Sequence, residues 1–365
     1  MAESRLDEHF EDQVVCVYPY THDWKPIVHF SEFLFPGQRL VASVRPLEGN
    51  MEQYAQKIIP YPSDSFSQVL LTEGISREGW PATVRRFLLQ SMEVDNCCPV
   101  PGDLFAEAGK IGASGKLRDY TIQGKWRDTC EPGKLYEIPV PVIFVLSLYE
   151  DLDKFALQIA LRKILCEESV SVSQIGTRQY CERFGFHSFP AFMFENELTA
   201  EEKVLAFNHY VYQMVVEENT DAIIIGIPGA YTKLNLSYPM KFGILPYLVS
   251  QAIVPDYAVM CTFYAEFPDD TFWKTISQSC SYKLGFHIDI FHMSGSYIDL
   301  QPTKALGKIK YTHVPDAVVD RMVQSRFADS FHTVFNGYSL IGEETLRASL
   351  LKNLATSYEE VGVKW

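Results

Sequence analysis

Residues 142–155 read VIFVLSLYEDLDKF, an apolar run followed by an acidic loop and a lysine. The run Val142–Leu146 has the continuous apolar character of a strand that is buried on both faces of a parallel sheet. Beyond the lysine, apolar residues recur at the i, i+3, i+4, i+7 spacing of an amphipathic helix: Leu157, Ala160, Leu161 and Ile164. The stretch therefore predicts a strand, a loop and a helix of an α/β protein.

The loop aligns with a phosphate-binding loop, GxxxxGK[ST], over residues 148–155 (LYEDLDKF). Lys154 is in register, but both glycines are missing and Phe155 replaces the hydroxyl that would hold magnesium. Three carboxylates would repel a triphosphate: Glu150, Asp151 and Asp153. We therefore interpret the loop as a degenerate Walker A motif that does not hydrolyse nucleotide. A plainer alternative is that one of the aspartates caps the helix and the lysine is solvated.

A second strand, Ala222–Ile227, leads to the same conclusion about nucleotide. NTPases of this type carry an aspartate at the end of a strand to organise Mg²⁺. Here the strand ends in glycine and proline, and Asp221 stands at its other end. ATP and GTP are therefore disfavoured, and we predict no cofactor. Gly226 and Gly229 remain candidate ligand-binding residues, since glycine lets the backbone approach a ligand closely.

The remaining elements predict two α/β domains. Strands are expected at Val14–Tyr18, Leu40–Val44 and Gln68–Leu71, with a helix around Val84–Leu88. Together they predict a Rossmann-like domain over residues 1–138. The stretch Gly102–Pro141 has little hydrophobic periodicity, and we interpret it as the end of this domain followed by a linker.

Residues 139–365 are predicted to form a doubly wound, parallel-sheet domain of the P-loop-NTPase-like type. A helix begins at Thr199, with Glu202 completing a capping box. Further strands are expected at Val170–Ile175, Tyr257–Phe263 and Leu284–Phe291, and further helices at 244–253, 316–331 and 343–359.

Composition and charge make several classes of partner unfavourable. The net charge is 32 − 46 = −14, which disfavours nucleic acid and anionic membranes as partners. The eight cysteines form no CxxC pair, as expected in a reducing compartment. There is no apolar run of the ~20 residues that a membrane helix needs. We therefore expect a soluble, cytoplasmic protein.

The segment Ser173–Pro190 is the densest polar and aromatic loop. Arg178 suits a carboxylate or a phosphate, and Tyr180 lies beside it as a further candidate for ligand binding. Cys181 and His187 are the candidate catalytic pair, because a histidine can activate a thiol as a nucleophile.

Two other groups of residues bear on ligands. Tyr20 and His22 follow the first strand and are expected to lie at a ligand or peptide edge, although an ordinary turn fits as well. His287 and His292 would lie on opposite faces of a strand, so we predict no metal site.

Several segments resemble the clostridial-type peptide maturation system proteins, a bacterial family. The similar segments are VVCVYPYTHDW (14–24), DKFALQIALR (153–162), SQIGTRQYCERFGFHSFP (173–190), AIIIGIPGA (222–230) and KFGILPYLVSQAIVPD (241–256). The family is encoded near radical SAM enzymes and precursors of ribosomally made, modified peptides (RiPPs). More distantly, the chain resembles two-domain proteins with a Rossmann-like front half and a P-loop back half of the nitrogenase-iron-protein or dethiobiotin-synthetase type.

The resemblance implies a natural-product pathway but assigns no reaction. It implies a peptide maturation protein that acts by binding a precursor peptide, a carrier protein or a maturation enzyme. Two alternatives remain open: an acyl- or peptidyl-transfer enzyme, and an atypical ATP- or GTP-dependent ligase, each using the carboxyl edge of the sheet. The sequence also leaves a homodimer open.

Overall fold

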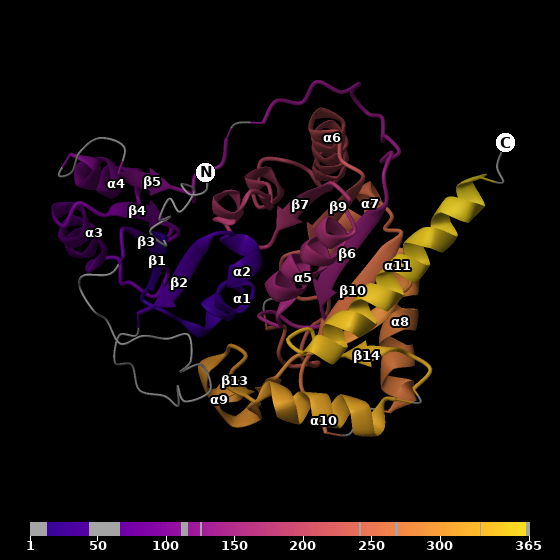
Figure 1. The fold of residues 1–365 in the computed structure, drawn as a ribbon. Helices are drawn as coiled ribbons and strands as arrows, with labels where there is room; N and C mark the ends of the chain where they lie inside the picture. Colours follow the sequence, from indigo (N-terminus) through magenta and orange to yellow (C-terminus); the bar gives the residue numbers. More distant parts are fainter. Residues whose placement is uncertain are drawn as a thin grey trace, which may run out of the picture. The chain divides into compact units, whose positions relative to one another are not determined.

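The structure, a computed structural model, describes residues 13–43, 66–110, 116–124, 126–240, 242–266, 269–328 and 330–362, without side-chain detail beyond 355. The chain divides into two compact units, Met1–Ile122 and Gln123–Trp365 (Figure 1). No helix in the described ranges combines the length and the hydropathy needed to cross a membrane.

The first unit is built on a five-stranded parallel sheet. Its strands are β1 (Gln13–Tyr18), β2 (Gln38–Ala42), β3 (Gln68–Leu71), β4 (Glu93–Asn96) and β5 (Leu117–Asp119). Their order, β2-β1-β3-β4-β5, is doubly wound, with the switch point between β1 and β3. The helices are α1 (Lys25–His29), α2 (Ser31–Leu34), α3 (Trp80–Leu89) and α4 (Gly102–Gly109). This confirms the prediction of a Rossmann-like domain. The second expected strand, Leu40–Val44, ends at a residue that lies outside the described ranges.

Strand β4 was not predicted, because its sequence EVDN is polar. Asp95 is buried there and accepts hydrogen bonds from Arg118 Nε (2.7 Å) and Gln68 Nε2 (2.7 Å). Asn96 is buried as well, and its Oδ1 accepts a hydrogen bond from Trp80 Nε1 at 2.9 Å. Polar side chains are thus satisfied by neighbours that hydrophobic periodicity cannot reveal.

The second unit is built on a seven-stranded parallel sheet. Its strands are β6 (Val142–Ser147), β7 (Val172–Gly176), β8 (His187–Ser188), β9 (Ala222–Gly226), β10 (Tyr257–Thr262), β11 (Ile290–Met293) and β14 (Val334–Phe335). The order is β14-β11-β10-β6-β9-β7-β8, which confirms a doubly wound sheet with β6 at its centre. The switch point lies between β6 and β10, so the loop after β6 stands where such sheets bind ligands. A separate antiparallel pair joins β12 (Ser296–Ile298) and β13 (Tyr311–His313).

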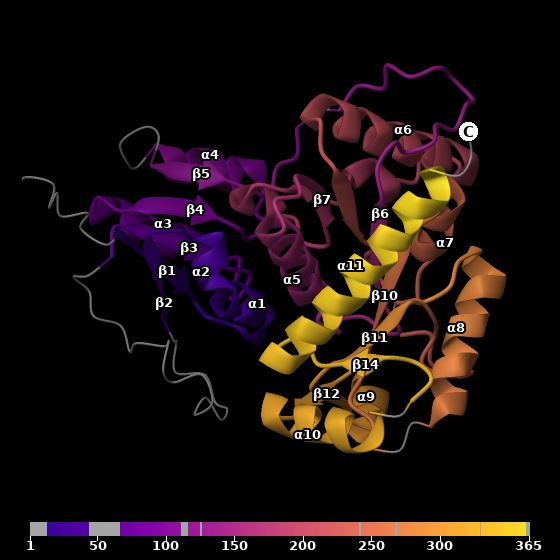
Figure 2. The same cartoon turned by 45° about the vertical axis from the view of Figure 1, so that its right-hand side comes forward.

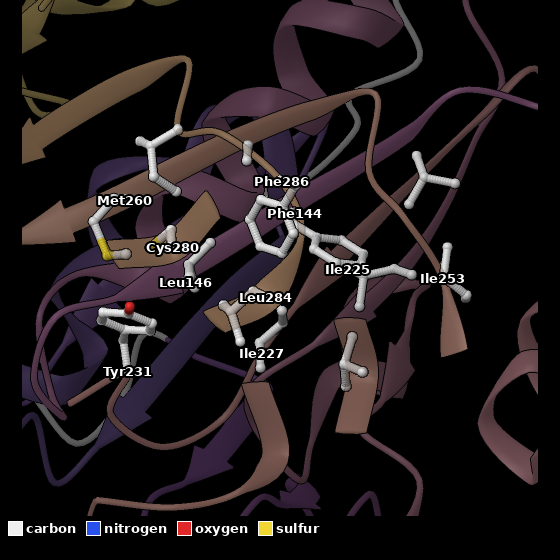
Figure 3. Packing of buried hydrophobic residues seen from close by; sticks show 14 of the residues in the cluster. Phe144, Leu146, Ile225, Ile227, Tyr231, Ile253, Met260, Cys280, Leu284 and Phe286 are labelled. Atoms are coloured by element: carbon white, nitrogen blue, oxygen red, sulfur yellow. The ribbon is translucent and has the colours of Figure 1, made fainter. Parts of the chain in front are cut away.

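Helices cover both faces of this sheet. Helices α5 (Lys154–Glu167) and α11 (Leu340–Gly362) lie against each other on one face (Figure 2). The other face is packed by α6 (Ala200–Glu218), α7 (Leu245–Ala252) and α8 (Asp270–Leu284). Phe144, Leu146 and Ile225 point into that second layer, where Figure 3 shows them among side chains such as Leu284 and Phe286. Two further helices are α9 (Leu300–Leu306) and α10 (Asp316–Arg326).

The expected strand at Leu284–Phe291 was wrong. Leu284 is the last residue of α8, and Gly285 ends that helix in the left-handed conformation (φ +84°). Phe286 and Ile288 are buried in the core as parts of a connection, so their alternation imitates a strand. The strand itself begins at Ile290.

The segment after Ile122 belongs to the second unit, not to a linker that ends the first domain. Trp126 Nε1 donates to Gln213 Oε1 (3.0 Å), and Tyr136 N–H donates to Asn208 Oδ1 (2.7 Å). Both acceptors are on α6, so side chains hold this irregular segment along the helix. The division therefore falls after Ile122 and not after Ile138.

Candidate functional site

The loop after β6 keeps the backbone of a tight turn without glycine. Asp151 (φ +59°) and Asp153 (φ +49°) are both left-handed. Asp153 occupies the position of the second glycine of a phosphate-binding loop, directly before α5. Aspartate tolerates this conformation better than most residues, at a cost of roughly 1 kcal/mol.

Asp153 stands at the N-cap of α5, but its side chain makes no capping hydrogen bond, so the expected cap is wrong for this residue. Its Oδ2 instead accepts a hydrogen bond from Ser294 Oγ (2.5 Å) and faces His292 Nε2 (3.4 Å), and Tyr338 OH donates to Oδ1 (3.3 Å). The buried His292 accepts Gly337 N–H at Nδ1 (3.1 Å), which places its proton on Nε2. Asp153 thus joins α5 to the end of β11.

Lys154 is buried, which makes the solvated alternative wrong. Its Nζ donates to the carbonyl oxygens of Ile227 (2.9 Å) and Gly229 (2.5 Å), just beyond β9. Burial lowers the pKa of this amine to about 8. The structure therefore brings Lys154 and Gly229 together, but it engages the lysine with backbone instead of leaving it for a phosphate.

Gly226 meets a side chain where a ligand was expected. A Cβ at this position would lie 2.3–2.4 Å from the carboxamide atoms of Gln158. Gln158 is fully buried and donates to Lys154 O (2.9 Å) and Thr177 Oγ1 (3.2 Å). The absence of a side chain at Gly226 thus serves packing between β9 and α5.

Phe155, at the position of the missing hydroxyl, begins an aromatic cluster. It packs edge-on against Tyr180 (6.2 Å between ring centroids), and Phe186 lies 6.0 Å away. The Arg178 guanidinium lies 5.9 Å from the centre of the same ring. Arg178 and Tyr180, both predicted as ligand-binding residues, therefore lie together beside α5.

Cys181 and His187 have separate partners. The thiol of Cys181 is buried and donates to Arg178 O (3.1 Å), and burial raises its pKa far above the ordinary value. His187 Nε2 lies 2.5 Å from Glu218 Oε1. The pair is not assembled as an activated thiol, which needs a lowered thiol pKa.

Alkylation of the native protein is expected to distinguish the cysteines. Cys166 is exposed and Cys130 half-buried, whereas Cys181 is buried with a raised pKa. Iodoacetamide should modify Cys166 and Cys130 at least tenfold faster than Cys181, because only accessible thiolates react. Peptide mass spectrometry with and without urea measures these rates. Rapid native labelling of Cys181 would restore it as a candidate nucleophile.

Tyr20 and His22 belong to the first unit and follow β1 near its switch point. Tyr20 is buried, whereas His22 is exposed in a short 3₁₀ turn. The loop is fixed to the residues after β3 through Thr72 Oγ1, which donates to Pro19 O at 2.6 Å. Their role in ligand binding stays a prediction.

A pocket that sequence reasoning missed lies over α6 in the second unit. It encloses about 950 Å³ and is bounded by α6, the segment that follows Gln123, and the residues around β8. This volume is within the range of ligand sites. Its lining spans Gln123–Glu218, so no short motif could have revealed it.

Six carboxylates line this α6 pocket, and none of its described lining residues is a lysine or arginine. The six are Asp128, Glu182, Glu195, Glu202, Glu217 and Glu218. The pKa of Glu218 is held below its usual range, chiefly by the hydrogen bond from His187, with Ser173 and the nearby Arg162 also contributing. Glu182 accepts hydrogen bonds from Ser188 N (2.9 Å) and Oγ (2.5 Å). Hydrogen bonds thus fix the positions of Glu218 and Glu182 in the pocket.

Three aromatic rings form one wall of the pocket. Trp126 lies 5.3 Å from Phe192 and 5.6 Å from Tyr210 between ring centroids, and the last two rings are 6.0 Å apart. Burial raises the pKa of Tyr210, and the negative charges of Glu182 and Glu218 raise it further. The aromatic wall and the carboxylates are therefore close neighbours.

Comparison with known proteins identifies the fold but no family. No protein-family model and no curated protein sequence matches this chain. A crystal structure of a DUF1611 family protein from Anabaena variabilis is similar over 93% of this chain and 100% of its own, with a TM-score of 0.58 and 11% identity. Chloroplast FtsY from Physcomitrella patens aligns over 44% of this chain and 51% of its own, at 13% identity, with a TM-score of 0.28, too low to support an argument. The likeness to the first protein is one of fold alone.

Proposed function

We propose that this protein binds a basic peptide segment in the α6 pocket and serves as a binding component of a peptide-maturation pathway. The observation that carries the proposal is the combination of six carboxylates and three aromatic rings in one pocket whose described lining has no lysine or arginine. The pathway is the one implied by the sequence resemblance.

Charge and ring geometry both favour a cation. The interaction of a lysine or arginine side chain with the face of an aromatic ring contributes about 0.5–2 kcal/mol to the free energy of binding. A nearby carboxylate adds to this attraction. Trp126 and Tyr210 offer such faces, with Glu182 and Glu218 beside Tyr210. The pocket volume of about 950 Å³ leaves room for more than one side chain.

The loop after β6 supports binding over nucleotide-driven catalysis. Lys154 is engaged by the carbonyl oxygens of Ile227 and Gly229, so it would have to leave two hydrogen bonds to reach a phosphate. Glu150 and Asp151 add negative charge to the same loop. Binding of a precursor peptide, carrier protein or maturation enzyme needs no such loop.

Peptide affinity tests the proposal. The probe is a fluorescein-labelled peptide with three arginines separated by serine and glycine, and its citrulline counterpart keeps the shape without the charge. Glu195→Gln/Glu217→Gln removes two pocket charges and should weaken binding of the arginine peptide about tenfold, at about 0.5–1 kcal/mol per charge. Trp126→Ala should weaken it about threefold to tenfold. Fluorescence anisotropy measures both.

The matched control separates the pocket from the general acidity of the protein. Glu32→Gln/Glu344→Gln changes the net charge equally at two exposed positions outside the pocket. This control should bind like the wild type, and the citrulline peptide should bind weakly to all proteins. Equal losses in the pocket and control variants would mean unspecific attraction and would contradict the proposal.

A further inference from the structure

We propose that Asp128, Cys130 and His209 form a binding site for a divalent ion of the zinc class in the wall of the α6 pocket. Each residue offers one ligand atom, and the three atoms lie within 4.8 Å of one another. No such site was predicted, because His209 is 81 residues from Asp128 in the sequence. The site goes beyond the proposed peptide binding and does not depend on it.

His209 is oriented as metal-bound histidines are. It is buried on α6, and its Nε2 faces Lys134 O at 2.7 Å. Its Nδ1 faces Asp128 Oδ2 at 2.7 Å. A neutral imidazole has only one N–H, so it cannot donate to both acceptors. With the proton on Nε2 and held by a backbone carbonyl, Nδ1 is left to bind a metal.

Asp128 and Cys130 are placed by the same turn. The backbone N–H of Cys130 donates to Asp128 Oδ1 at 3.0 Å, which orients the carboxylate and leaves Oδ2 toward His209. Cys130 is half-buried, so its thiol remains accessible to an ion. Ligands at about 2.0–2.3 Å in a tetrahedron stand about 3.3–3.7 Å apart. Metal binding would therefore move His209 Nδ1 and Asp128 Oδ2 apart from their present separation of 2.7 Å.

The ligand types select the metal. One thiolate, one imidazole and one carboxylate suit zinc and similar transition ions, whereas Mg²⁺ and Ca²⁺ prefer oxygen alone. Asp128 and His209 both line the pocket, so the fourth position would be reached from the pocket side. Three protein ligands with one open position are the arrangement that zinc takes where it binds an exchangeable ligand.

Cobalt titration of the full chain tests the site. Co²⁺ replaces zinc in such sites, and a bound thiolate gives an ultraviolet charge-transfer band. We expect one Co²⁺ per chain with this band, displaced by Zn²⁺. Cys130→Ser should abolish the band and weaken binding at least tenfold. Cys166→Ser, at an exposed cysteine outside the cluster, should leave both unchanged.

Alkylation provides a second measurement that does not depend on spectra. Zn²⁺ should slow labelling of Cys130 at least tenfold but leave Cys166 unaffected. The competing explanation is a doubly protonated His209, which would donate to both Asp128 and Lys134 O without a metal. In that case Zn²⁺ should not protect Cys130 from alkylation, and Co²⁺ should give no charge-transfer band. Cobalt binding without the band, or a band that survives in Cys130→Ser, would overturn the proposal.

Discussion

Between pH 7 and pH 10.5, the stability of the wild-type protein relative to Lys154→Met is expected to increase by about 3 kcal/mol. Burial lowers the pKa of Lys154 from 10.5 to about 8 in the folded protein. In the unfolded chain the amine keeps its ordinary pKa, so between these values the unfolded state binds more protons. The free energy of unfolding then rises with pH, by about 1.4 kcal/mol for each unit of pKa difference.

The comparison with a variant is needed because other groups titrate in the same range. Burial raises the pKa of Cys181 and Tyr311, for example. Because the folded state holds the protons of such groups to higher pH than the unfolded state does, they lower the free energy of unfolding as the pH rises. These groups are present in both proteins and cancel in the difference. Lys154→Met keeps the length of the side chain but removes the titrating amine.

Urea denaturation at half-unit steps of pH, with the transition of the second unit followed, measures this difference. Ile225→Val, a change without a titrating group in the same unit, should differ from the wild type by a constant amount at every pH. A difference between wild type and Lys154→Met that does not change with pH would show that the amine is hydrated and not held by Ile227 and Gly229.

Lys154 also shows how far the sequence could predict this site. The strand, the loop and the helix around it follow from hydrophobic periodicity, and they are correct. The direction of its side chain depends on Ile227, 73 residues later, which no local pattern reveals. The motif alone shows only that Phe155 replaces a hydroxyl residue, whereas its packing against Tyr180 gives the reason for an aromatic ring at this position.

The α6 pocket was beyond prediction for a related reason. Its carboxylates come from four places: the segment near Asp128, the turn before β8, the connection between β8 and α6, and α6 itself. Each of these stretches alone resembles a solvated surface. Only the packing of that segment along α6 brings Trp126 beside Tyr210. Because the segment has no hydrophobic periodicity, its sequence predicts a linker.

Gly226→Ala is expected to destabilise the second unit by about 1–3 kcal/mol, the usual cost of overfilling a core. The new methyl group would lie 2.3–2.4 Å from Gln158, which is buried and held by hydrogen bonds to Lys154 O and Thr177 Oγ1. Thermal or urea denaturation measures the loss. Gly243→Ala is the control, since a Cβ there meets nothing within 4 Å.

A second substitution at Gln158 decides what the glycine is for. If Gly226 is required for packing, Gln158→Ala/Gly226→Ala should be more stable than the sum of the two single changes predicts, by about 1 kcal/mol or more, because the clash is removed. If Gly226 instead lets the backbone approach a ligand, the two changes should be additive in stability, and Gly226→Ala should leave the free energy of unfolding nearly unchanged. The carboxamide of Gln158 is fully buried, which favours the first outcome. Gly226 then affects the carboxyl edge of the sheet only by making room for Gln158, which is hydrogen-bonded to Lys154 O.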